Sequence, residues 1–491
     1  MEMEFTKTAI PCLKQILCRT AAQEQTQELR LGDGMPDAGR VLGCWGQLLA
    51  RGKQWRDRRI SLSAGCTIWV LYAPEDGSQA QMLEGYVPLQ LEWELPETET
   101  SGDIRVDMEI SGMDARIVSP RKLMVRLNVN AQARAFVPDY VSSFESREIP
   151  EDVQLLKKTY PVTLICEAGE KMVNPEERFS LPGAEKILCY HMMPVVTETK
   201  LSAGRLLIKG IGKVTLLCMG TDGKLFTESL ELPFSQLADP QGEVGENADV
   251  DVTVCPTGLE VDLEDDAQLR VRADLVCQYL ICQRQEVTLF EDCYSNLRDL
   301  NAVTGKVSIP AILDSVAQTV SLEIPWEYES GEVVNCSLWT RLTQSRAGDG
   351  GVACELRGTC QVLCYNREGK LDSKILPWEE SMHFPSSEAC DMVFALKRGE
   401  LLKERHGSIS ADMELTGECM SQEEKTLITA LELGEEKERD EGRPSVILRR
   451  AGTQELWDLA KACGSTVEGI RRANELEDEP VADMLLLIPV T

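Results

Sequence analysis

The feature that most constrains the fold of this chain is an internal repeat with a period of 146 residues. Three times, an apolar run is followed by a short turn that ends in an acidic residue and a glycine. The glycines are Gly77, Gly223 and Gly369. An upstream marker keeps the same step, because the segment 36–42 (PDAGRVL) aligns with the segment 182–188 (PGAEKIL). Self-similarity at a fixed period is typical of chains built from repeated structural units. The sequence therefore predicts three units of similar topology in tandem.

Each unit carries the pattern of antiparallel β-strands. The Asp-Gly or Glu-Gly pair supplies the positive φ that a tight turn needs. A second group of strands follows, in which apolar and polar residues alternate; its apolar positions in the first unit are Leu123, Val125, Leu127 and Val129. Such alternation buries one face of a strand. The expected fold is mainly β, with three tandem β-sandwich or barrel-like repeat domains and a small C-terminal module. The repeats are expected at residues 1–145, 146–299 and 300–433.

The pattern changes in the last sixty residues. Residues 434–444 are polar and bounded by glycine and proline, which predicts an acidic linker. Residues 445–491 show helical periodicity between two short apolar segments, so a strand-helix-helix-strand module is expected there. Thr453 is predicted to cap the first helix, and Ser465 with Glu468 is predicted to form a capping box for the second.

The composition limits the classes of function. The net charge of −30 disfavours binding to DNA, RNA or an anionic membrane, because such binding depends on cations that neutralise phosphates. The chain has only three histidines and contains neither His-Glu-x-x-His nor Gly-x-Ser-x-Gly. We therefore expect a protein that is not an enzyme and that uses no cofactor.

The 18 cysteines and the apolar runs bear on the compartment. No Cys-x-x-Cys pair occurs, so we expect reduced thiols that serve as small strand residues, with no metal site. The N-terminal segment carries Glu2, Glu4 and Lys7 and lacks the apolar core of a signal peptide. The longest apolar runs, Cys66–Ala73 and Met484–Val490, are far shorter than the ~18 residues that a transmembrane helix needs. A cytoplasmic protein without transmembrane insertion is expected.

The C-terminal module resembles the LysM domain. The helix opening of that family, Leu-Trp-x-Ile-Ala-Lys, is matched by the segment 456–461 (LWDLAK), the second helix by 466–474 (TVEGIRRAN) and the closing strand by 486–489 (LLIP). The sequence departs from the family before the first helix, where Gly-Asp-Thr is replaced by 452–455 (GTQE), and before the last strand, where Pro-Gly-Gln is replaced by 482–484 (ADM). Both departures lie in or beside loops that flank the glycan groove of LysM domains, so they disfavour sugar binding.

With this module identified, the repeats resemble SPOCS domains, which are found in endospore-forming bacteria, often ahead of a C-terminal LysM domain. The resembling segments are 182–188, 216–223 and 232–235. Together, repeats and module are similar to the SipL-like spore-coat assembly proteins. The resemblance implies a scaffold that acts in the mother cell, at the forespore surface and spore coat, and whose LysM domain binds a SpoIVA-like coat-base morphogenetic ATPase. The alternative is a cell-wall or cortex protein that binds peptidoglycan through its N-acetylglucosamine-containing glycan.

The candidate partner-binding surface lies in the module, where cations are concentrated within an otherwise acidic chain. Arginine and aromatic residues dominate the binding energy of protein interfaces. The residues chosen on this ground are Arg449, Arg450, Thr453, Trp457, Lys461, Arg471 and Asn474. For Trp457 a place in the core of the module is an equal alternative.

Overall fold

The computed structural model describes residues 2–3, 6–95, 101–145, 150–241, 245, 247–264, 267–326, 332–346, 351–384, 393–398, 403–405, 408–437, 442, 444–477 and 483–490. These residues lie almost entirely in β-strands, and the two helices among them are short and close to the C-terminus. The expected mainly β fold class is confirmed.

The first repeat is a β-sandwich built around long strands. It begins with β2 (Thr6–Arg30) and ends with β6 (Asp103–Ser119) and β7 (Lys122–Glu145); β7 pairs with both of the others. Between them, β3 (Ala38–Arg56), β4 (Arg59–Pro74) and β5 (Gln81–Glu94) form a three-stranded antiparallel sheet. The two sheets share one core, to which β4, β5 and β7 contribute alternate residues. The alternation expected for 123–129 is therefore that of a strand with one buried face.

The second and third repeats follow the same order of a long strand, a three-stranded sheet and further strands that end in a long one, with the short strand β9 added in the second. The second has β8 (Val153–Val173), β9 (Glu176–Ser180), the sheet of β10 (Ala184–Ser202), β11 (Arg205–Gly220) and β12 (Leu225–Ala238), then β13 (Asp249–Leu263) and β14 (Gln268–Ser295). The third has β15 (Arg298–Pro325), the sheet of β16 (Glu332–Arg346), β17 (Val352–Tyr365) and β18 (Leu371–Phe384), then β19 (Val393–Arg398), β20 (Lys403–Arg405) and β21 (Ser408–Glu436). Strand β1 (Glu2–Met3) pairs with β21.

The turn glycines that defined the period occupy equivalent places. Gly77, Gly223 and Gly369 have φ of 73°, 79° and 73°, and each lies in the turn between the second and third strands of its three-stranded sheet. A side chain is strained in this left-handed conformation, which is why glycine recurs at the position.

The three repeats share two apolar cores, so they are not separate beads. One core contains Leu42, Leu188 and Val334, together with Leu71, Leu217 and Leu363, and within each set the members are 146 residues apart. A polar chain runs beside it, in which the indole of Trp45 donates to Asn335 (3.0 Å) and the amide of Asn335 donates to Thr227 (3.1 Å). Equivalent residues that meet in one core imply an approximate three-fold arrangement of the repeats.

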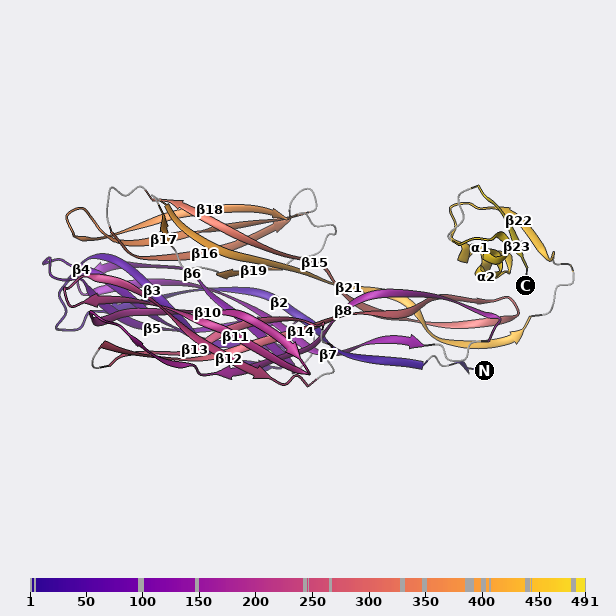
Figure 1. The fold of residues 1–491 in the computed structure, drawn as a ribbon, viewed down its shortest axis with the longest axis horizontal. Coiled ribbons are helices and arrows are strands. Elements are labelled where there is room, and N and C mark those ends of the chain that lie inside the picture. The colour runs from indigo at the N-terminus through magenta and orange to yellow at the C-terminus, as the bar shows by residue number, and fades with distance from the viewer. Residues whose placement is uncertain are drawn as a thin grey trace.

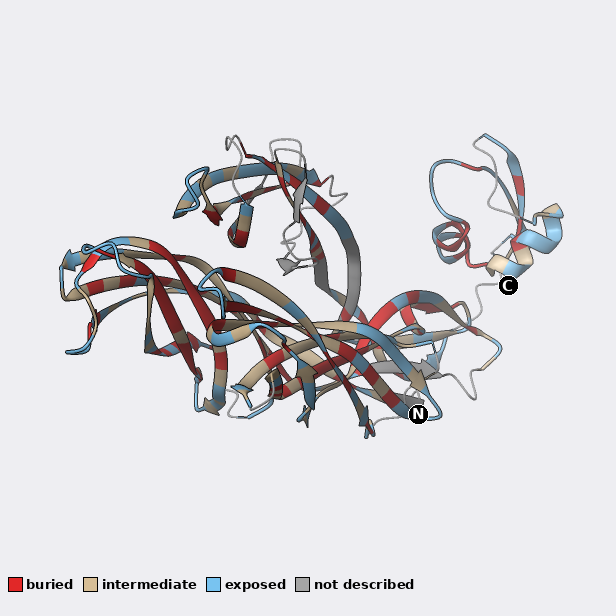
Figure 2. Cartoon of the chain, turned by 60° about the vertical axis from the view of Figure 1, so that its left-hand side comes forward, coloured by how far each residue is buried: buried red, intermediate tan, exposed pale blue. Residues whose placement is uncertain are grey.

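The second shared core lies along the long strands. These strands continue beyond the sandwiches, toward the right in Figure 1, where β2, β7, β8, β14, β15 and β21 run together. The core there takes Val141 from the first repeat, Val287 and Phe290 from the second, and Ile428 and Leu431 from the third. Figure 2 shows the resulting bands of buried residues alternating with exposed ones along the strands.

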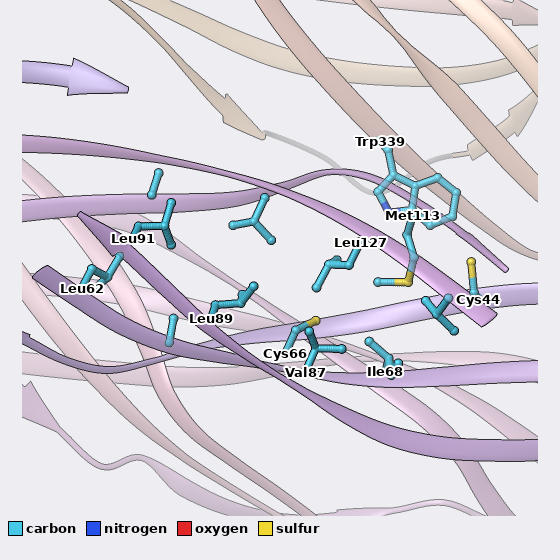
Figure 3. Close-up of a cluster of buried hydrophobic side chains, with 14 of the residues drawn as sticks. Cys44, Leu62, Cys66, Ile68, Val87, Leu89, Leu91, Met113, Leu127 and Trp339 are labelled. Atoms are coloured by element: carbon cyan, nitrogen blue, oxygen red, sulfur yellow. The ribbon is translucent and has the colours of Figure 1, made fainter. Parts of the chain in front are cut away.

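Side chains also cross from one repeat into the sandwich of another. Figure 3 shows Trp339, from β16 of the third repeat, lying beside Met113 and near Cys44 of the first repeat. All three belong to the core of the first sandwich, and Trp339 is only 6% exposed. The core of the first repeat is therefore completed by the third.

Two expected boundaries differ from the observed strands. Strand β15 begins at Arg298, so the boundary at 299/300 falls inside it, and β21 runs to Glu436, into the segment expected to be linker. Arg298 pairs with Glu436, and the amide of Lys437 donates to the carbonyl of Leu297. The strand ends are exposed and polar, so their composition could not be told from that of a linker.

The C-terminal module has the expected element order. Strands β22 (Val446–Arg450) and β23 (Leu485–Pro489) pair antiparallel, and α1 (Leu456–Cys463) and α2 (Val467–Asn474) lie between them in the chain.

Both predicted helix caps were wrong. The residue before α1 is Glu455, which makes no side-chain capping bond, so Thr453 lies outside the helix. Helix α2 is capped by Thr466, whose hydroxyl accepts from the amide of Gly469 at 2.9 Å. Ser465 instead donates its hydroxyl to the carbonyl of Pro489. Ser465 and Thr466 both carry a hydroxyl that could cap α2. Ser465 is buried and bonded to β23, so Thr466 is the residue that caps the helix.

Candidate functional site in the C-terminal module

The module has a small core of its own. Helices α1 and α2 cover one face of the two-stranded sheet, and the residues buried between them include Leu456, Leu459, Ile470, Leu486 and Ile488. Ile470, Leu486 and Ile488 are fully shielded from solvent. The apolar positions of both helices thus face the sheet, as expected for amphipathic helices.

Trp457 lies where the module meets β14. Its side chain is 9% exposed and belongs to the same core cluster as Tyr294 of β14. The two rings pack edge to face with centroids 4.9 Å apart, and the indole nitrogen donates to Asp292 Oδ2 at 2.8 Å. Trp457 therefore combines a place in the module core with a contact to the second repeat.

Lys461 reaches the same carboxylate from the next turn of α1. Its Nζ lies 2.8 and 2.7 Å from the two carboxylate oxygens of Asp292. Partial burial opposes the ionisation of Asp292, but the hydrogen bonds from Lys461 and Trp457 outweigh it and hold the pKa of Asp292 below its usual value. Asp292 is therefore an ionised acceptor for two donors of α1.

The loop between the helices forms a second anchor. The carbonyl oxygen of Ser465 accepts from the hydroxyl of Tyr294 and from the amide of Asn296, each at 3.0 Å. Leu156 of β8 adds an apolar contact to the same cluster. The end of β14 and the turn after it therefore bind α1 and its following loop.

Asn474 holds the module together internally. Its Nδ2 donates to the carbonyls of Ile470 (2.8 Å) and Leu487 (2.6 Å), and its Oδ1 accepts from the amide of Leu487 (2.8 Å). These bonds link the end of α2 to the middle of β23. The side-chain amide is thus used within the module.

The other predicted residues lie on exposed parts of the module. Arg449 approaches Cys463 Sγ at 3.8 Å, and Arg450 donates to the carbonyl of Asp483 at 3.4 Å. Thr453 and Arg471 are exposed as well. Trp457 and Lys461 form one contact with β14, whereas these four lie elsewhere on the module. Binding of a partner by the set stays a prediction, and most of its members already have partners within the chain: Trp457 and Lys461 on β14, and Asn474, Arg449 and Arg450 within the module.

The sequence reasoning missed an apolar face on this module. One face of the β22–β23 sheet carries exposed aliphatic residues, namely Val446, Leu448, Leu485 and Leu487. The signal was present, because 485–489 (LLLIP) is apolar at successive positions. A strand with apolar residues on both faces is typical of burial on both faces.

A cavity of about 400 Å³ lies between the first and second repeats. Lys53, which lines it, reaches Glu170 Oε2 at 2.8 Å and Gln278 Oε1 at 2.7 Å. The hydroxyl of Tyr279 donates to Glu167 at 2.9 Å. Lys53 of the first repeat is thus paired with two groups of the second, while Tyr279 and Glu167 pair within the second, so the lining of the cavity is a polar contact between two repeats.

The chain matches no protein-family model, no curated protein and no solved structure with which it was compared. Within the described ranges, neither helix has the length and apolar character to cross a membrane. The same ranges hold no group of three or more His, Cys, Asp or Glu side chains arranged for a metal ion.

Proposed function

We propose that this protein is a non-enzymatic scaffold of endospore coat assembly. Its LysM-like module recruits or stabilises a SpoIVA-like morphogenetic ATPase at the forespore surface, on the mother-cell side. The sequence resemblance of the repeats to SPOCS domains and of residues 446–490 to LysM domains supports this proposal. The observation that carries it is the exposed apolar sheet face on a small module held at the end of long strands. Contiguous exposed apolar surface is typical of protein-binding sites.

The architecture supports a scaffold. The three repeats share two cores, so they form one extended support along which the long strands continue (Figure 1). The module is attached at one end of that support through β14 and its following turn. Such an arrangement presents a binding module at a fixed place.

The proposal is tested by following tagged full-length chain and a 1–443 truncation in sporulating cells. The full-length chain is expected at the forespore surface, whereas the truncation is expected to be dispersed in the mother cell. An unchanged location of the truncation, with both chains at equal level, would contradict the role of the module.

The glycan-binding alternative is tested separately. The full-length chain is incubated with insoluble peptidoglycan and with chitin and then sedimented. Under the scaffold proposal it stays in the supernatant, because the loops that flank a LysM groove are altered and Asn474 is bonded within the module. Saturable co-sedimentation at micromolar concentration would favour the cell-wall function.

A further inference from the structure

The two-stranded sheet of the module leaves one face uncovered. Helices α1 and α2 cover the other face. The exposed fractions on the open face are 46% for Val446, 65% for Leu448, 57% for Leu485 and 39% for Leu487. Single exposed aliphatic residues are common on proteins, but four on adjacent strands form a contiguous patch.

The strand register arranges these residues in two rows. Leu448 lies opposite Leu487, and Val446 lies opposite Pro489. Arg450 lies opposite Leu485, so the alternation of β22 places this cation on the same face, at one end of the apolar rows. The open face is therefore an apolar strip with a positive end.

The open face remains accessible while the module is docked on the second repeat. The docking contacts come from Trp457, Lys461 and Ser465, which belong to α1 and the loop after it. These elements lie on the covered side of the sheet. A partner on the open face therefore does not compete with the contact to β14.

We propose that this open face binds an amphipathic helix of a partner protein, with a carboxylate of that helix at Arg450. The inference rests on the proposed function and names the surface that performs it. Five residues of strand span about 17 Å and two strands are about 10 Å wide, which matches a helix of about three turns and about 10 Å diameter. A helix on this side completes a three-layer arrangement that buries both faces of the sheet.

The charges favour a partner of different sequence over a second copy of this chain. Arg450 donates to a backbone carbonyl, and within the described residues it forms no ion pair with a carboxylate. A carboxylate from outside the chain supplies that charge complement. Two copies of this chain, each with a net charge of −30, repel each other.

The experiment places a photo-crosslinking benzophenone residue at position 448 of the full-length chain, expressed in its native cells. A matched chain carries the same residue at Ala473, which is exposed on α2. Position 448 is expected to crosslink to one segment of one other protein, with aliphatic residues at helical spacing and an Asp or Glu beside them. No crosslink above the Ala473 control, a crosslink to another copy of this chain, or a segment without that pattern overturns the proposal.

The crosslinked segment is then synthesised as a peptide, and its binding to the full-length chain is measured. Leu448→Asp is expected to weaken binding at least about 30-fold, which is typical of a central interface residue. Arg450→Glu is expected to weaken it as well, and a peptide with Lys in place of the carboxylate is expected to restore it. Unchanged binding by Leu448→Asp, or failure of the charge exchange to restore binding, overturns the proposal.

The two proposals fail in different ways. If the crosslinked protein is not the morphogenetic ATPase, the proposed function is wrong while the docking face stands. If the module directs the chain to the forespore surface but position 448 yields no crosslink, the docking face is wrong while the proposed function stands.

Discussion

At the scale of single residues, the cysteines are part of the apolar cores. Cys218 and Cys364 are fully buried at the repeat position that Tyr72 occupies in the first copy, and Tyr72 is buried too. Burial raises the pKa of the Cys218 thiol to about 12, and that of Cys66 likewise to about 12. A thiol with such a pKa is almost entirely protonated near neutrality, so these side chains act as small apolar residues.

The native chain is therefore expected to resist alkylation. At pH 8, iodoacetamide should modify Cys66 and Cys218 much more slowly in the folded protein than in urea, because the thiolate is the reactive form. The measurement is mass spectrometry of the peptides after timed exposure. Equal rates in the folded and unfolded chains would show that these sites are open.

Asp292 joins the module to the second repeat through two donors of α1. It accepts hydrogen bonds from both Trp457 and Lys461. Since its pKa is lowered in the folded state, the stabilisation is present above the usual Asp pKa of about 4 and is lost as the pH falls through the lower folded value.

Asp292→Asn is expected to loosen the module at neutral pH and to remove this pH dependence. The measurement is hydrogen exchange of the α1 amides, expressed as protection at each pH. Asp458→Asn, an exposed change in the first turn of the same helix, is the matched control and should lower protection much less, by the small effect of a lost helix-terminal charge. Equal protection in wild type and Asp292→Asn would mean that the ion pair contributes nothing to docking.

At the scale of elements, the side chain of Asn474 ties α2 to β23 within the module. The side-chain amide of Asn474 pairs with both backbone groups of Leu487 on the edge of β23, and its Nδ2 also donates to the carbonyl of Ile470. Backbone groups of this kind are costly to leave without a partner.

Asn474→Ala is accordingly expected to destabilise the module by about 1–3 kcal/mol, the usual cost of leaving such groups unsatisfied. Hydrogen exchange of the β23 amides measures the change, and the repeats should keep their protection. Thr453→Ala, exposed and outside both helices, should have little effect. Normal protection of the β23 amides in Asn474→Ala would show that the hydrogen bonds of Asn474 do not stabilise the module.

The elements also show how far sequence reasoning reached. The fold class and the turns followed from local signals, because a glycine with positive φ and apolar alternation are both visible in the sequence. The helix caps were displaced, since Ser465 and Thr466 carry equivalent hydroxyls and only tertiary contacts distinguish them. The contact of Trp457 with Asp292 joins residues that are 165 positions apart in the sequence, and no local sequence pattern predicts it.

At the scale of the whole molecule, the shared cores make the repeats interdependent. Leu217 is buried among its equivalents Leu71 and Leu363, which belong to the other two repeats. Loss of its side chain leaves a cavity that all three repeats line. The spacing predicted the equivalence of these residues, but not that they meet, because a period alone does not place repeats relative to one another.

Leu217→Ala is therefore expected to cost about 2–5 kcal/mol of unfolding free energy, in the usual range for a buried leucine. Protection against hydrogen exchange should fall in all three repeats together, not in the second alone. Leu237→Ala, at an exposed position of the same repeat, is the matched control. A loss confined to the second repeat would show that the repeats unfold independently.

The insertion of Trp339 into the first sandwich has a consequence for how such a chain can be shortened. Deleting the third repeat removes a wall of the first one and uncovers both shared cores. The apolar surfaces exposed in this way would associate with those of other molecules, so the shortened chain is expected to form oligomers. The three repeats therefore form one folding unit, from which none can be removed without exposing a shared core.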